Sequence, residues 1–227
     1  MAKYTPGPLV GQMSGGIGCV VATRGRYGSV LRIGVMPTKR TTAFTVAQRG
    51  LLGALSKAWG ALDDGERAAW NTWASMNPII DSLGQSRVLA GNAAFIELNA
   101  RILYVGGTQI DLPPVAAAPV PISGATLTCT TAGDAQVGWT SGALAAGCKL
   151  VVWAALINSA GRSYYKNLLK AVAVSAAAGA TPFFHGPSVT TRFGKQIAGQ
   201  ILKEHLFVVD SATGLMSSVA IAQVTVS

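Results

Sequence analysis

Residues 112–121, Leu-Pro-Pro-Val-Ala-Ala-Ala-Pro-Val-Pro, separate two parts of the chain that differ in hydrophobic periodicity. Four prolines within nine residues remove backbone donors and fix φ, which excludes a helix or a central strand and predicts a semi-rigid connector. Apolar residues before this stretch recur with helical spacing, whereas those after it alternate as in strands. The sequence therefore predicts an α+β protein with a domain boundary at this linker.

Three short helices are predicted over residues 45–111, before the linker. Apolar residues on one face predict the first helix over residues 46–62. Asp63, followed three residues later by Glu66, matches a capping box and predicts the start of the second helix. The third is predicted over residues 91–105. The core of this helical module is expected to hold its tryptophans, Trp59, Trp70 and Trp73. Tryptophans exposed at a partner surface are the alternative.

After the linker, residues 122–227 are predicted to form seven or eight short strands. The strands recur at intervals of about 8–12 residues with glycine-containing turns between them, which is typical of an antiparallel β-sandwich. Trp139 and Trp153 are expected in its core. The predicted strands are residues 125–130, 135–140, 149–154, 161–166, 169–176, 188–193, 200–209 and 217–226.

The N-terminal segment, residues 1–44, combines eight glycines and three prolines with scattered aliphatic residues. Glycine at this density disfavours helices and strands. The segment also has too little apolar bulk for a core of its own. We interpret it as an extended arm that becomes ordered against another surface. A glycine-rich hairpin packed on its own domain is the alternative.

The net charge of +9 is concentrated in the N-terminal part. Residues 1–62 hold eight Lys or Arg and no acid, residues 63–112 carry a net −3, and residues 113–227 carry a net +4. Such asymmetry indicates an anionic partner. An acidic protein surface is favoured over nucleic acid, because the cations are sparse and almost no aromatic residue accompanies them. The cations expected to contact the partner are Arg24, Arg26, Arg32, Lys39 and Arg40.

Composition disfavours several classes of protein. Half of the residues are apolar and 12% are charged, which excludes a chain that is disordered throughout. No apolar run approaches the roughly 20 residues of a transmembrane helix, and the first residues lack the apolar core of a secretory signal. The three cysteines lack metal-ligand spacing, and Cys129 and Cys148 are expected to form a reduced, buried pair. We expect a soluble protein made in a reducing cytoplasm.

No catalytic constellation is found in the sequence. His185 and His205 each lack a second His or Cys at metal-ligand spacing, so both are interpreted as structural. Half of the acidic residues within positions 63–112 already serve to cap a helix. No pair of carboxylates for general acid–base chemistry can be identified. Neither a nucleophile elbow nor a phosphate-binding loop is present. The sequence therefore predicts a non-enzymatic protein with no catalytic residues, no metal and no cofactor.

Two parts of the chain resemble known families. Residues 122–227 resemble a fibronectin type III or immunoglobulin-like (Ig-like) domain, through the strand that carries Trp139 and a closing hairpin over residues 207–218. The N-terminal half resembles a group of phage virion structural proteins. It shares with them the glycine-rich basic start over residues 7–18, an Ala-Gln-Arg helix at residues 47–49 and a Glu-Arg-Ala-Ala-Trp-Asn helix at residues 66–71. The resemblance implies a component of a virion.

We expect from this resemblance and from the basic segment a non-enzymatic virion protein of a bacteriophage, made in the host cytoplasm. The first expectation is a capsid decoration or cement protein that clamps shell subunits through its arm. Its partners would be the major capsid protein and further copies of itself, as a homo-oligomer. A tail or neck adaptor, a fibre-attachment protein and a nucleic-acid-binding protein inside the head are the alternatives. No membrane partner is expected.

Carbohydrate binding by the β-sandwich is a further hypothesis from the sequence. It requires exposed aromatic residues in the loops of the sandwich. The candidates are Phe183, Phe184, Tyr164 and Tyr165, at least two of which are expected to be buried instead.

Overall fold

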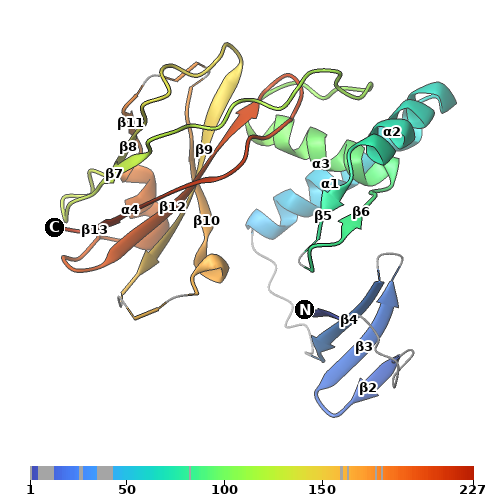
Figure 1. Ribbon diagram of the computed structural model, residues 1–227, viewed down its shortest axis with the longest axis horizontal. Helices are drawn as coiled ribbons and strands as arrows, with labels where there is room; N and C mark the ends of the chain where they lie inside the picture. Colours follow the sequence, from blue (N-terminus) through green and yellow to red (C-terminus); the bar gives the residue numbers. More distant parts are fainter. Residues whose placement is uncertain are drawn as a thin grey trace. The chain divides into compact units, whose positions relative to one another are not determined.

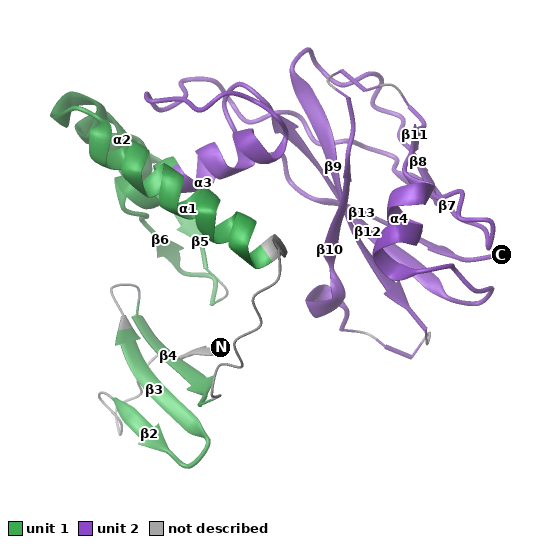
Figure 2. Cartoon of the chain, turned by 180° about the vertical axis from the view of Figure 1, so that it is seen from behind, with its two compact units in different colours: residues 1–95 green, residues 96–227 purple. Residues whose placement is uncertain are grey.

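The computed structural model shows a chain that divides into two compact units, Met1–Phe95 and Ile96–Ser227 (Figure 2). It contains helices and antiparallel sheets, which confirms the predicted α+β class. The division falls within helix α3 (Gly91–Tyr104), so the predicted linker, residues 112–121, lies inside the second unit. The residues described are 2–4, 13–25, 28–34, 43–81, 83–158, 161–162, 164–176, 178–179 and 181–227.

A four-stranded antiparallel sheet of order β1-β4-β3-β2 begins the first unit (Figure 1). Its strands are β1 Ala2–Tyr4, β2 Gly15–Ile17, β3 Val20–Gly25 and β4 Gly28–Ile33. The prediction of an extended arm over residues 1–44 is therefore wrong for the described part of this segment, and the alternative hairpin is present in β3 and β4. Glycine is the reason, because Gly18 (φ +57°) and Gly28 (φ +106°) adopt left-handed backbone at the turns between short strands.

The three predicted helices are confirmed as α1 (Ala43–Ala61), α2 (Asp64–Met76) and α3. The capping box is also confirmed. The Asp63 carboxylate accepts from the Glu66 amide at 2.6 Å, and the Asp63 amide donates to Glu66 Oε2 at 2.9 Å. A short hairpin of β5 (Ile79–Ile80) and β6 (Ser86–Arg87) lies between α2 and α3 in the chain. Within the part of the chain that is described, no helix is long and apolar enough to cross a bilayer.

Aromatic residues pack together in the helical part of the first unit. Trp70 is fully buried and lies edge-on to Phe95, with ring centroids 5.4 Å apart. Trp59 and Trp73 are half-buried and contact Phe95 and Trp70 at 5.6 Å and 6.0 Å. The predicted tryptophan core is thus confirmed for Trp70, and the other two tryptophans lie at its edge.

The second unit contains two antiparallel sheets, of order β10-β9-β12-β13 and β11-β8-β7. Their strands are β7 Thr126–Thr128, β8 Gln136–Gly138, β9 Cys148–Ile157, β10 Lys170–Val174, β11 Phe183–Phe184, β12 Ile201–Asp210 and β13 Ala220–Thr225. The longest ladder joins β9 to β12 over ten residue pairs. Most of the predicted strands are confirmed, and residues 107–125 form neither helix nor strand, as the prolines predict.

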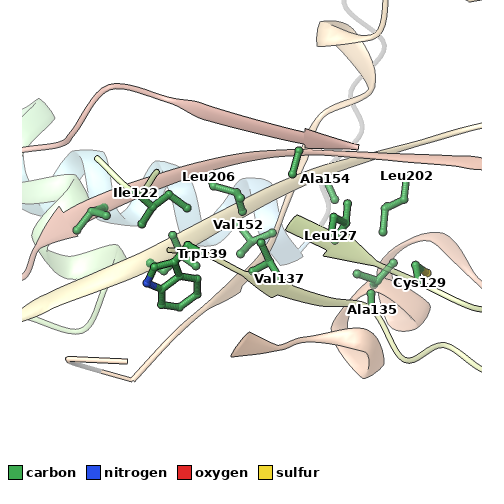
Figure 3. Packing of buried hydrophobic residues seen from close by; sticks show 14 of the residues in the cluster. Ile122, Leu127, Cys129, Ala135, Val137, Trp139, Val152, Ala154, Leu202 and Leu206 are labelled. Carbon is green, nitrogen blue, oxygen red and sulfur yellow. The ribbon is translucent and has the colours of Figure 1, made fainter. Parts of the chain in front are cut away.

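One hydrophobic core is shared by the two sheets (Figure 3). Leu127 and Val137 of the smaller sheet and Val152 and Leu206 of the larger one belong to the same cluster of buried side chains. Trp139 is 5% exposed, and its indole nitrogen donates to the Gly142 carbonyl at 2.7 Å, which confirms its predicted core position. The core therefore satisfies the polar atom of its largest side chain.

Two predicted strands are wrong. Residues 188–193 belong to a helix, α4 (Gly186–Phe193), although their β-branched residues favour a strand. Pro187 in the first helical turn is the overlooked signal, because its fixed φ suits a helix start. Residues 161–162 and 164–165 form neither helix nor strand, and the 3₁₀ turn η1 (Lys166–Leu168) follows them.

The three cysteines give a direct test of this fold. Cys19 is exposed, whereas Cys129 and Cys148 are buried and free, as predicted. Burial, with the Asp134 and Glu204 carboxylates, raises the pKa of Cys129 to about 11, and burial raises the pKa of Cys148. Because the thiolate is the reactive form, we expect an aromatic disulfide reagent at pH 8 to titrate one thiol per native chain. Three thiols are expected in denaturant, and fast reaction of either remaining thiol in the native Cys19→Ser variant would contradict the burial.

Candidate functional site

The predicted partner-binding cations do not form one cluster in the part of the chain described. Arg24 in β3 and Arg32 in β4 are both exposed, whereas Arg26, Lys39 and Arg40 lie outside the described residues. The β3–β4 register pairs Arg24 with Ser29 and Arg32 with Val21. Paired residues share a face and successive residues alternate, so Arg24 and Arg32 lie on opposite faces of the sheet.

The face that carries Arg24 also carries a row of aliphatic residues. Ile17 pairs with Val20, and Val20 pairs with Ile33, so the three form a row across β2, β3 and β4. Their exposed fractions are 79%, 43% and 69%. Over residues 13–24 and 28–34, Ala22 is the only one buried. This face therefore offers aliphatic contact beside a cation, a combination that the sequence alone did not indicate.

A second candidate site lies on the outward face of the larger sheet of the second unit. Leu150, Val152 and Ala154 of β9 point into the core, so Trp153 between them points outward and is 41% exposed. The prediction of a core position for Trp153 is therefore wrong. The ring of Phe207 on β12 lies 5.9 Å from it in an edge-on arrangement. Strand alternation within residues 148–157 was the signal that could have placed this tryptophan outside.

Tyr165 and His205 extend this aromatic cluster. His205 pairs directly with Trp153 across β9 and β12. The Tyr165 hydroxyl and His205 Nε2 share a hydrogen bond of 3.0 Å, and the Lys203 ammonium lies 4.5 Å from the Tyr165 ring centroid. We call Trp153, Tyr165, Lys203, His205 and Phe207 the aromatic face. The hydrogen bond between Tyr165 and His205 holds the tyrosine in place, and the cation–π contact holds Lys203 beside it.

The aromatic face is electrostatically positive or neutral. Burial, with the nearby charge of Lys166, lowers the pKa of His205 below its ordinary value, which favours the uncharged imidazole. The outward positions of β9, β12 and β13 hold Lys149 and Lys203 but no carboxylate. The face is therefore suited to a neutral or anionic ligand.

The four aromatic residues proposed for carbohydrate binding divide into two groups. Tyr164 and Phe184 are 63% and 55% exposed, and Tyr165 and Phe183 are half-buried. Of these four, Tyr165 joins the aromatic face, and Phe183 instead packs against the core and stacks on His185 at 5.5 Å. The sequence thus indicated one member of this face and missed Trp153, Lys203, His205 and Phe207.

His185 and Glu204 form a buried hydrogen-bonded pair in the second unit. His185 Nε2 and Glu204 Oε1 are 2.7 Å apart, and both side chains are fully buried. His185 Nδ1 lies 3.3 Å from the Phe183 carbonyl, and Glu204 Oε2 is a buried oxygen with no hydrogen-bond partner among the residues that the structure describes. A substrate cannot reach either group, so the pair is structural. Among the residues described, no three His, Cys, Asp or Glu side chains are grouped to hold a metal ion.

Comparison with known proteins adds no assignment to these sites. No protein-family model matches the chain, and a search of curated proteins finds no match.

Proposed function

We propose that this chain is a non-enzymatic structural protein of a bacteriophage virion, a capsid decoration or cement protein that docks through its N-terminal sheet. The observation that carries the proposal is the exposed face of that sheet, where the aliphatic row of Ile17, Val20 and Ile33 lies on the same side as Arg24. Small sheets need a covered hydrophobic face for stability. A partner that is both apolar and acidic would supply this cover.

Charge supports an acidic protein as that partner. Residues 1–62 contain no acid, so Arg24 and Arg32 have no carboxylate near them in sequence. A capsid surface repeats the same junction many times, and a docked protein that also contacts its own copies gains avidity. We therefore include further copies of this chain, in a closed homo-oligomer, among the proposed partners. Nucleic acid fits less well, because few aromatic residues accompany the cations of residues 1–44, so a platform on which bases could stack is lacking.

We further propose that the second unit is an Ig-like or fibronectin III-like sandwich. With its strands labelled A, B, C, C′, E, F and G in chain order, the two sheets read E-B-A and C′-C-F-G. This division of strands supports the proposal, because sandwiches of this class separate A, B and E from C, F and G. Helix α4 occupies the connection between E and F. An experimental structure with a different strand order would exclude this assignment.

Charge reversal tests the docking mechanism. We expect replacement of all five cations, Arg24, Arg26, Arg32, Lys39 and Arg40, by glutamate to abolish binding to capsids assembled without this protein. Occupancy is measured by quantitative mass spectrometry after density-gradient purification. Binding of the wild-type chain should also weaken as salt rises, because exposed charge pairs are screened. The matched control reverses Lys170 and Lys195, exposed cations of the second unit. Full occupancy of the fivefold variant would contradict the mechanism.

Copy number separates this proposal from its alternatives. A molar ratio to the major capsid protein near one, or a simple fraction of it, is expected for a shell component. A ratio of a few per cent would instead indicate a tail or neck adaptor or a fibre-attachment protein. Absence from purified particles would exclude the virion. Salt-dependent retention on DNA that is lost without residues 1–44 would then favour nucleic-acid binding.

A further inference from the structure

We propose that the aromatic face of the second unit binds an acidic glycan, with one sugar ring against Trp153 and the anionic substituents beside Lys203 and Lys166. The site lies within the second unit, whereas the cations through which we propose docking belong to the first, so the inference goes beyond the proposed function and does not depend on it.

Trp153 is exposed although the neighbouring residues on its strand are buried. Val152 and Ala154 are fully buried, whereas Trp153 keeps 41% of its surface accessible. Phe207 contacts it edge-on, which fixes the indole from one side. The negative face of an aromatic ring attracts the polarised C–H groups of a sugar. An indole that is held in place and partly accessible provides such a platform.

The cation and the polar groups beside Trp153 are already ordered. Lys203 Nζ lies 4.5 Å from the Tyr165 ring centroid, and the Tyr165 hydroxyl is hydrogen-bonded to His205. Tyr165 is thereby held over the sheet, and Lys203 is positioned next to it. Side chains that are ordered before binding lose less entropy when a ligand arrives. Lys203 can therefore meet a carboxylate or phosphate group at little conformational cost.

Charge selects an anionic ligand over a cationic one. Lys203 is accompanied by Lys166, whose charge acts on His205, and outward positions of β9, β12 and β13 hold no acid. A second copy of this same face would place lysines opposite lysines, which disfavours a symmetric contact. The ligand is thus expected to carry carboxylate or phosphate groups.

The extent of the face favours a glycan over an acidic protein. At one end, Val105 and Met216 pack against Val151 and Val209 and cover the sheet. At the other, Tyr165 lies over His205. Stable protein interfaces bury about 800 Å² on each partner, which requires far more than one tryptophan and its neighbours. One accessible indole with its neighbours therefore suits a small ligand, such as a sugar ring, better than a protein surface.

A hollow lies near the end of β9, the strand that carries Trp153. It has a volume of about 250 Å³ and is lined by Leu156, Ile157, Asn158, Arg162 and Leu168. Ile157 and Trp153 point to the same side of β9, because they are four residues apart in one strand. Arg162 adds a further cation, and Asn158 adds an amide that already accepts from Gln200 at 2.8 Å.

Calorimetry on the full chain tests the proposal with hexagalacturonate, whose pyranose rings each carry a carboxylate. We expect a Kd of about 0.1–1 mM at low salt, and weaker binding of neutral cellohexaose. Trp153→Ala should weaken hexagalacturonate binding at least about tenfold, as for a central aromatic contact. Lys203→Gln should weaken it about threefold and reduce its salt dependence. The matched controls are Tyr164→Ala and Lys195→Gln, exposed residues outside the aromatic face, and neither should change the Kd.

Three results would overturn the proposal. One is no heat of binding for hexagalacturonate at about 5 mM. Another is equal weakening in Trp153→Ala and Tyr164→Ala. The third is binding of hexaglutamate, sensitive to Trp153→Ala, without binding of the sugar, which would assign the face to an acidic polypeptide. If Trp153→Ala does not fold, binding is measured with Trp153→Phe and Lys203→Gln instead, because both substitutions retain most of the side chain's volume.

Discussion

Replacement of His185 by leucine is expected to lower the free energy of unfolding of the second unit by about 3–5 kcal/mol. The reason is that the substitution leaves Glu204 buried without its partner. Glu204 is fully buried, its Oε1 lies 2.7 Å from His185 Nε2, and its Oε2 has no hydrogen-bond partner. Without His185, Glu204 Oε1 would lose its hydrogen bond, and both oxygens of this buried side chain would then lack a partner among the residues described. Because domains are stable by about 5–15 kcal/mol, this variant is expected to lose a large part of its stability.

A double variant separates the loss of the pair from the loss of the His185 side chain. Replacing both partners of a buried hydrogen-bonded pair by apolar residues of similar shape can be nearly neutral or stabilising. We therefore expect His185→Leu/Glu204→Met to recover most of the stability that His185→Leu loses. Glu204→Gln should be milder than His185→Leu, because an amide can still form a hydrogen bond with the imidazole.

Thiol labelling during a urea titration provides the measurement. Cys129 and Cys148 both belong to the second unit and are buried, so in a Cys19→Ser background their reaction reports on unfolding of this unit alone. With slopes of about 1–3 kcal/mol per molar urea, His185→Leu should lower the midpoint by at least about 1 M. A shift below about 0.3 M, or a double variant less stable than His185→Leu, would contradict the role of the pair.

Replacement of Trp70 by alanine is expected to destabilise the helical part of the first unit by about 3–5 kcal/mol. Trp70 is fully buried, and its ring contacts Phe95 at 5.4 Å and Trp73 at 6.0 Å. The truncation removes a large apolar surface and leaves a cavity between two aromatic rings. Because Trp70 holds the centre of this small core, we expect Trp59 and Trp73 to lose their fixed packing as well.

Amide hydrogen exchange, resolved by peptide, tests this prediction, because it reports on the first unit separately from the second. Amides of α2 should lose protection in Trp70→Ala, whereas peptides of β9 and β12 should exchange as in the wild-type chain. Met76→Ala is the matched control, because Met76 lies on the same helix and is 74% exposed, so its effect should stay within about 0.5 kcal/mol. Unchanged protection of α2 in Trp70→Ala would show that this tryptophan does not support the helix.

Local signals in the sequence predicted local structure well. The capping box fixes the start of α2, because Asp63 and Glu66 satisfy each other's amides within four residues. The opposite case is α4, where the β-branched residues Val189, Thr190 and Thr191 favoured a strand. Pro187 and the contacts of this segment with the rest of the second unit outweigh that propensity. Propensity decides only where packing does not.

The candidate sites depend on pairings that the sequence does not display. His185 and Glu204 are 19 residues apart and meet only after α4 and β12 have taken their places. Trp153 and His205 become neighbours through the register of two strands about 50 residues apart. The positions of Arg24 and Arg32 on opposite faces follow from the β3–β4 register, whereas composition alone suggested one continuous basic arm. Charge content could be predicted, but its distribution over a surface could not.

The ladder between β9 and β12 also determines the order of events during synthesis. Ile157 ends β9, and Asp210, which ends β12, follows it by 53 residues. Ribosomes add about 5–20 residues per second. The synthesis of β12 is therefore complete only roughly 3–10 s after that of the hydrophobic strand β9, with which it forms the longest ladder. β10 can cover one edge in the meantime, but the other edge stays available to any neighbouring nascent chain. Yield in a heterologous host should therefore depend on chaperone supply and on slow induction at low temperature, even though the finished protein buries this strand.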